Sequence, residues 1–246
     1  RYFKFISKVF SKVIENLTIH QWKTLHRMMD EPILKYIAED FFSNSDEEVL
    51  TVFDVGANIG NFTKKILNDF PMAKVYSFEP SKTTYNTLVS NFIGVDRVVP
   101  VNIALSDEDK EGKFYHSKHS TCSSLKTPWE KTDTWETVSI KKLDTFCFDN
   151  QIEKINILKI DAEGSDFEVI KGTERMLLLG KIDIVYVECG FKPGNSCHGD
   201  FFKIAEYFRR FKYNVAGFTE TSNFEYNGVY TLLFCNTIFA KEKIKQ

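Results

Sequence analysis

The sequence predicts an α/β fold with a doubly wound, mostly parallel sheet, an antiparallel strand pair at its C-terminal end, and helices before it. Short apolar, β-branched segments alternate with amphipathic segments from residue 49 to residue 211, a pattern typical of parallel strands connected by helices. The segments 49–55, 155–160 and 182–187 are strongly apolar, as expected for strands buried on both faces. The last two, 213–218 and 229–240, have no helix between them. Parallel neighbours need a connection of about a dozen residues or more, so these two strands are expected to be antiparallel.

Composition limits the class of protein. The chain has 246 residues, of which 43% are hydrophobic, enough for one sizeable core. A net charge of −2 gives no general attraction for nucleic acid, so no nucleic-acid partner is expected. The five cysteines are scattered and form no Cys-x-x-Cys pair. This favours a reducing compartment, and we expect a cytoplasmic protein.

Residues 1–45 are predicted to form a helical segment, followed by the main domain over 46–246. Apolar residues recur at helical spacing near the start of the chain, beside a basic row of Lys4, Lys8 and Lys12. We favour packing of this face on the protein's own domain. Peripheral membrane contact, or contact with an upstream domain, through residues 1–42 stays open. Pro32 is expected to open a second helix over 33–42.

The main domain then follows as a series of strands and helices. Residues 112–116 and 137–140 interrupt the alternation and are predicted to be antiparallel strands. The remaining strands are expected at 49–55, 74–78, 98–104, 155–160 and 182–187, and the helices at 58–68, 83–92, 143–150, 167–179 and 200–211.

A glycine-containing loop, Asp54-Val-Gly-Ala-Asn-Ile-Gly60, lies between a predicted buried strand and a helix. Gly56 and Gly60 are expected to let the backbone turn tightly and approach a ligand, at the sheet edge where open α/β sheets bind ligands. Dinucleotide sites favour Gly-x-Gly-x-x-Gly, and this spacing is not met. The Asp54 carboxylate would repel a pyrophosphate, but it suits a ligand with an amino group and a sulfonium. S-adenosylmethionine is therefore favoured over a nicotinamide dinucleotide.

Glu79 follows the next predicted strand, where a carboxylate can accept both hydroxyls of a ribose. This observation supports an adenosine-containing ligand without choosing between the two cofactors.

These motifs resemble the FkbM family of methyltransferases. The likeness covers about residues 52–187 and is most specific in Leu158-Lys-Ile-Asp-Ala-Glu-Gly164 and Val169-Ile-Lys-Gly172. The resemblance implies a Rossmann-like fold of the class I methyltransferase type, with O-methylation of sugars, glycans or related metabolites. It also implies that Ser106 and Asp107 lie near the adenine and Asp161 near the methionyl end of the cofactor. Other motifs that carry it are Phe78-Glu-Pro80, Asn102-Ile-Ala-Leu-Ser-Asp107 and Ser120-Thr-Cys-Ser-Ser-Leu125.

The expected cofactor-binding residues share a place at or next to a strand end. They are Asp54, Gly56, Asn58, Gly60, Asn61, Glu79, Pro80, Asn102, Ser106, Asp107 and Asp161.

Transfer to a hydroxyl needs a base, and four residues are candidate catalytic groups. Asp161 and Glu188 follow neighbouring strands, and His119 and His198 lie in loops expected to overhang them. Glu163 is either a third acid of this group or part of a turn. A divalent cation held by these carboxylates is an alternative that we do not favour, and no residue is assigned as a metal ligand. Zinc at Cys189, Cys197 and His198 is disfavoured by the spacing.

The leading hypothesis is an O-methyltransferase that acts on a small-molecule or glycan acceptor. Two alternatives stay open: an NAD(P)-dependent oxidoreductase, and a methyltransferase-like domain that binds without catalysis.

Overall fold

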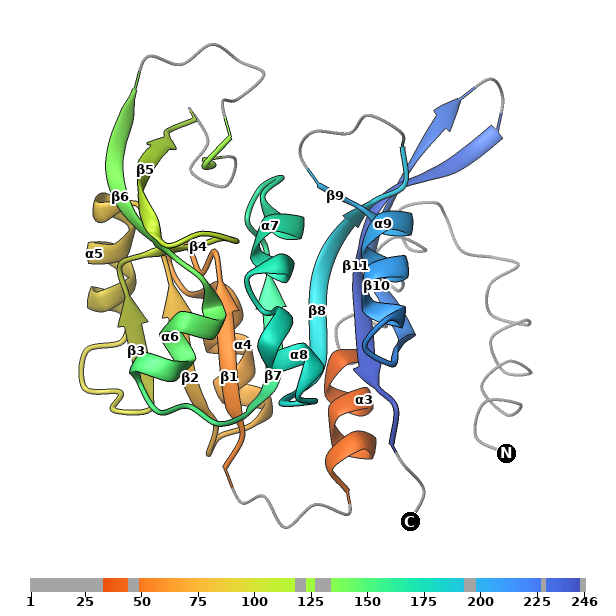
Figure 1. The fold of residues 1–246 in the computed structure, drawn as a ribbon, viewed down its shortest axis with the longest axis horizontal. Helices are drawn as coiled ribbons and strands as arrows, with labels where there is room; N and C mark the ends of the chain where they lie inside the picture. The colour runs from red at the N-terminus through yellow and green to blue at the C-terminus, as the bar shows by residue number, and fades with distance from the viewer. Residues whose placement is uncertain are drawn as a thin grey trace, which may run out of the picture.

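The computed structural model describes residues 33–43, 49–117, 123–126, 134–192, 198–226 and 229–243. Its centre is an eight-stranded sheet in the order β10-β11-β8-β7-β1-β2-β3, with the short strand β9 paired to β8 (Figure 1). All pairs are parallel except those made by β11 with β8 and with β10. The predicted mostly parallel sheet with an antiparallel C-terminal pair is therefore confirmed. The strands are β1 (Thr51–Val55), β2 (Lys74–Phe78), β3 (Val98–Val101), β7 (Ile155–Ile160), β8 (Ile182–Gly190), β9 (Gly199–Asp200), β10 (Tyr213–Tyr226) and β11 (Val229–Lys241).

The order of the strands places a topological switch point between β1 and β7. From β1 the chain moves outward to β2 and β3, and it then returns to the other side of β1 to form β7 and β8. Loops that leave neighbouring strands in opposite directions open a crevice at their carboxyl ends, where open α/β sheets bind ligands.

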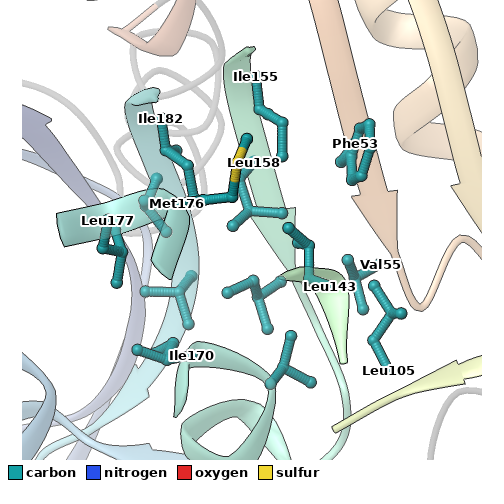
Figure 2. Close-up of a cluster of buried hydrophobic side chains, with 14 of the residues drawn as sticks. Phe53, Val55, Leu105, Leu143, Ile155, Leu158, Ile170, Met176, Leu177 and Ile182 are labelled. Carbon is teal, nitrogen blue, oxygen red and sulfur yellow. The ribbon is translucent and has the colours of Figure 1, made fainter. Parts of the chain in front are cut away.

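Helices cover both faces of this sheet. Side chains of β1 alternate between two cores: Val52 packs with α3 and α4, whereas Phe53 and Val55 pack with α6, α7, α8 and α9. Figure 2 shows the second core, with Leu143, Ile170 and Met176 turned toward the strands. The helices are α3 (Ile33–Phe42), α4 (Asn61–Asp69), α5 (Lys82–Asn91), α6 (Leu143–Asp149), α7 (Asp166–Lys171), α8 (Glu174–Leu178) and α9 (Phe201–Arg209).

A second, three-stranded sheet rises beside the carboxyl ends of the central strands (Figure 1). It consists of β4 (Ala104–Leu105), β6 (Trp135–Lys141) and β5 (Lys110–Tyr115), in that order. The β5–β6 pair is antiparallel, as predicted.

The strand predicted over 98–104 is wrong at its end, because β3 stops at Val101. The Asn102 side chain donates to the carbonyls of Glu79 and Pro80 at 2.8 and 2.9 Å. This bonding accompanies the turn of the chain out of the large sheet into β4.

Two predicted helices also differ from the observed ones, each at a glycine-containing turn. The helix predicted from residue 58 begins at Asn61, because Asn58 and Gly60 have φ angles of 51° and 92°. The helix predicted over 167–179 is divided into α7 and α8 at Gly172. A Cβ on Gly172 would lie 2.0 Å from the Ser106 carbonyl oxygen, so this glycine lets the helix end pack against the loop after β4.

The helix predicted over 33–42 matches α3, whose Leu34 and Ala38 are buried against the sheet. The basic row at Lys4, Lys8 and Lys12 lies outside the described residues, and the domain division at residue 45 stays a prediction. Among the described residues, no helix is long and apolar enough to cross a membrane.

The turn after β1 passes unusually close to the end of β7. Gly56 has a φ of 74°, and a Cβ there would lie 1.9 Å from the Asp161 carbonyl oxygen. The tight turn expected at Gly56 is confirmed, and the atom that a side chain there would meet first belongs to the protein.

We expect Gly56→Ala to destabilise the protein by about 2–4 kcal/mol, from a left-handed alanine and a backbone clash. Gly94→Ala is the matched control, because Gly94 has a φ of 77° with nothing within 4 Å of its added Cβ. It should cost about 1 kcal/mol, the conformational part alone. Urea denaturation of both variants measures the difference. Equal losses would contradict the importance of this close approach.

Candidate active site

A pocket lies at the carboxyl ends of β1, β2 and β7, at the edge of the sheet where open α/β folds bind their ligands. Its two sides have different chemistry. The apolar side comes from β2, the second sheet and the segment Ser123–Lys126, and the acidic side comes from the turn after β7. The apolar side chains are Phe78, Pro80, Ile103, Leu105, Phe114 and Leu125.

Glu79 lines the pocket directly after β2 and is 6% exposed. Its Oε1 accepts from the Ser81 backbone N–H at 2.9 Å, and its Oε2 accepts from the Asn58 N–H at 3.0 Å. Burial raises the pKa of Glu79 to about 7, against the lowering effect of these two hydrogen bonds. Pro80 also lines the pocket. Asn102 lies behind both, where its amide holds their carbonyl groups.

Asp54 was expected to line the pocket, but it does not. It is fully buried, it accepts from the Thr63 hydroxyl at 2.8 Å, and it lies 3.2 Å from the Lys159 ammonium. Gly60 also faces protein, because a Cβ there would lie 2.3 Å from the Phe92 ring. Asn61 is exposed at the start of α4.

Asp161 and Glu163 line the pocket in the turn after β7. Asp166 shapes this turn, since its carboxylate accepts from the Ala162 N–H at 2.8 Å and from the Gly164 N–H at 3.1 Å. Glu163 takes a φ of 47°, an uncommon conformation for a residue with a side chain. Burial raises the pKa of Glu163 to about 8, with further contributions from the charges of Asp161, Glu188 and Asp166.

The segment Ser123–Lys126, far from this turn in the sequence, contacts it through hydrogen bonds. Tyr115 and Ser124 exchange two backbone hydrogen bonds, at 2.9 and 3.1 Å. The Ser124 hydroxyl then donates to the Glu163 carbonyl at 2.7 Å, and the Lys126 ammonium donates to the Gly164 carbonyl. The connection between β5 and β6 therefore reaches the acidic side of the pocket.

Glu188 and His198 form a pair beside this turn. The Oε2 of Glu188 lies 2.8 Å from Nδ1 of His198, and the imidazole packs on Phe234 with ring centroids 4.5 Å apart. Burial works to lower the pKa of His198, but the hydrogen bond and charge of Glu188 outweigh it and raise that pKa. His119, the other candidate histidine, lies outside the described residues.

Ser106 and Asp107 lie just beyond the pocket-lining residues of β4. The Ser106 hydroxyl donates to Oδ1 of Asp107 at 3.3 Å, and Lys171 forms an ion pair with Oδ2. Burial works to raise the pKa of Asp107, and the hydrogen bond and charge of Lys171 lower it. Asp107, the acid expected near the adenine, is thus already paired with Lys171.

Within the described part of the chain, no group of three or more His, Cys, Asp and Glu residues is arranged to hold a metal ion. Of the three residues considered for zinc, Cys189 is buried, His198 pairs with Glu188, and Cys197 lies outside the described residues.

Sequence reasoning assigned no role to Lys159, Asp166 or Lys171, although all three lie in or beside the quoted motifs. Of these three, only Lys159 has a sequence context that could have indicated its role. A lysine inside an apolar parallel strand must find a charged partner, because an unpaired buried ammonium is costly.

The fold is a Rossmann-like sheet with a pocket at its switch point, and Glu79, Asp161 and Glu163 are among the residues that line the pocket. The family model of the methyltransferase FkbM domain matches residues 54–215, and the chain belongs to this family. The predicted family and fold are confirmed, and the family disfavours the oxidoreductase alternative.

The chain is similar, at low sequence identity, to two methyltransferases. The chain is 27% identical over 176 residues to the hexuronic acid methyltransferase AglP of Haloferax volcanii, covering 70% of this chain and 68% of that protein. It is 24% identical over 152 residues to the 2-O-methyltransferase NoeI of Sinorhizobium fredii, covering 56% and 62%. The chain thus spans about two thirds of the length of these two relatives.

Among solved structures, precorrin-6y C5,15-methyltransferase from Geobacter metallireducens matches with a TM-score of 0.46 and 10% identity. The match covers 85% of this chain and 88% of that one.

We expect the ligand-free protein to be more stable at pH 6 than at pH 8.5. The folded-state pKa values of Glu163 and Glu79, about 8 and about 7, lie above their unfolded value of 4.5. The folded state therefore holds protons that the unfolded state has released, and stability falls as pH rises through this window. Each kcal/mol lost lowers Tm by about 2–4 °C in a domain of this size.

Thermal unfolding at the two pH values measures the effect. Glu163→Gln, which cannot ionise, should reduce the fall in Tm between pH 6 and pH 8.5. An unchanged fall in this variant would contradict the role of Glu163.

Proposed function

We propose that this chain transfers a methyl group from S-adenosylmethionine to a hydroxyl oxygen of a sugar, glycan or related metabolite. The observation that carries the proposal is a nucleoside-type pocket with a carboxylate-oriented histidine beside its acidic end. The family and two relatives, a hexuronic acid methyltransferase and a 2-O-methyltransferase, support the same function.

The residues of the pocket fit the three parts of the cofactor. Apolar side chains such as Leu105 and Phe114 suit an adenine ring, and Glu79 suits the ribose hydroxyls. Asp161, on the acidic side, suits a positively charged amino group. The cofactor, when bound, supplies a methyl group made electrophilic by its sulfonium.

The Glu188–His198 pair suits removal of the acceptor's proton. Because Glu188 accepts from Nδ1–H, the neutral imidazole carries its lone pair on Nε2. Nε2 is then the atom that accepts a proton from a hydroxyl, and the neighbouring carboxylate stabilises the imidazolium that forms. Asp161 is better suited to positioning, because Oδ2 of its side chain is already paired with Lys159.

We expect His198→Ala to reduce kcat for methyl transfer by about 10²–10⁴-fold, the usual contribution of a positioned base. Glu188→Gln should reduce it less, because it disturbs the orientation of the imidazole and leaves the base in place. The affinity for S-adenosylhomocysteine should not change in either variant. His116→Ala is the matched control, since that histidine pairs with Glu136 at 3.1 Å in the second sheet.

The measurement is transfer of labelled methyl groups to a panel of neutral, acidic and amino sugars. Full activity in His198→Ala and Glu188→Gln together would contradict the assigned base. Absence of transfer to every acceptor, with S-adenosylhomocysteine still bound, would favour the non-catalytic alternative.

Cofactor affinity should depend on pH through Glu79, whose pKa is about 7. Each Glu79 oxygen already accepts one backbone N–H, and protonation would occupy a further lone pair that could otherwise accept from a ribose hydroxyl. Affinity should therefore weaken as pH falls from 8 to 6. Calorimetric titration with S-adenosylhomocysteine measures this, with NAD⁺ as the control ligand. Glu79→Gln should bind more weakly with a flatter pH dependence. Preferential binding of NAD⁺ would contradict the proposed function.

A further inference from the structure

Lys159 is a buried charge at the centre of the molecule. It lies in β7, and its side chain is 9% exposed. Moving an ammonium ion out of water costs several kcal/mol unless good partners replace the water. The arrangement of those partners therefore shows what the lysine does.

Its partners belong to the two turns that meet at the switch point. The Lys159 Nζ lies 3.2 Å from Oδ1 of Asp54, 3.2 Å from Oδ2 of Asp161 and 3.3 Å from the Gly56 carbonyl oxygen. Asp54 ends β1 beside Val55, Gly56 is in the turn after β1, and Asp161 opens the turn after β7. One ammonium group thus joins the two turns that flank the pocket.

The two carboxylates differ in what they can still bind. Asp54 is fully buried and does not line the pocket: Oδ1 forms an ion pair with Lys159, and Oδ2 accepts from the Thr63 hydroxyl, which itself bonds Ser77 at 2.7 Å. The Asp161 side chain is 38% exposed and lines the pocket. Its Oδ1 has no hydrogen-bond partner within the described residues, so this oxygen is available to a ligand.

The backbone already holds the two strands together without Lys159. The Asp161 N–H donates to the Val55 carbonyl at 3.1 Å, and β1 and β7 pair in register from Val52 to Val55. What the ammonium adds is the direction of the Asp161 side chain and of the Gly56 carbonyl. Its charge also offsets the repulsion between two acids that would otherwise face each other.

We propose that Lys159 is a positioning residue of the cofactor site: its ammonium group aims the Asp161 carboxylate at the amino acid end of the cofactor. The inference rests on the proposed function, because it assumes that S-adenosylmethionine binds in this pocket. It predicts a selective defect. Loss of the ammonium should weaken ligands that carry the amino acid part and spare ligands that lack it.

The experiment compares S-adenosylhomocysteine with 5′-methylthioadenosine, which keeps the adenosine and thioether but has no amino acid part. Calorimetry on the full chain gives the Kd of each ligand. Lys159→Met, similar in length and uncharged, should weaken binding of S-adenosylhomocysteine at least tenfold and change that of 5′-methylthioadenosine less than about twofold. Lys159→Arg, which keeps the charge, should recover part of the loss.

Two further variants guard against a general loss of structure. Asp161→Asn keeps Lys159 paired with Asp54, and it should show the same selectivity even if Lys159→Met fails to fold. Lys241→Met removes a lysine that pairs with Asp183 at the opposite end of the sheet, and it should leave both affinities unchanged.

Equal weakening of both ligands, or no weakening, in Lys159→Met or Asp161→Asn would overturn the positioning role while leaving the proposed function standing. Failure of the wild-type chain to bind either ligand would overturn both.

Discussion

The turn after β1 and the turn after β7 lie in direct contact, and the geometry of the site depends on that contact. Gly56 is the residue that permits it, because any side chain there would overlap the Asp161 carbonyl. The contact brings Glu79, bonded to the Asn58 N–H, and Asp161 to one pocket. It also places three oxygen acceptors around a single buried ammonium group. The contact between the two turns therefore determines the local packing, the placement of the buried charges and the shape of the pocket.

The acidic side of the pocket is built from carboxylates that serve the protein as well as a ligand. Asp166 is almost fully buried and shapes the turn that carries Asp161 and Glu163. Burial raises its pKa to about 6. Several acids are thus close together before any cation is bound. A ligand with positive charge would relieve their mutual repulsion, which is consistent with a sulfonium-bearing cofactor.

The alternation of strands and helices was predictable because each element buries a repeating apolar pattern, and β2, β7 and α3 match their predicted bounds. Errors fell where a single side chain or a backbone angle decides the path, as at Asn102 and Gly60. The sequence also predicted site residues of which Glu79 and Asp161 line the pocket, while Glu188 and His198 pair with each other; their roles stay predictions. The sequence could not show that the Asp54 side chain faces the protein interior. An acid at the end of a strand gives the same sequence pattern whether it binds a ligand or a lysine far away in the sequence.

Two glycines, one in the loop after β1 and one at the end of α7, have a consequence for comparing relatives. Gly56 and Gly172 each exclude a side chain because a carbonyl group of the protein lies in its place, that of Asp161 and that of Ser106. A descendant that had lost its cofactor would still need both glycines in order to fold. Their presence therefore marks shared architecture, whereas the proposed site residues Glu79, Asp161, Glu188 and His198 are free to change without a backbone clash of this kind.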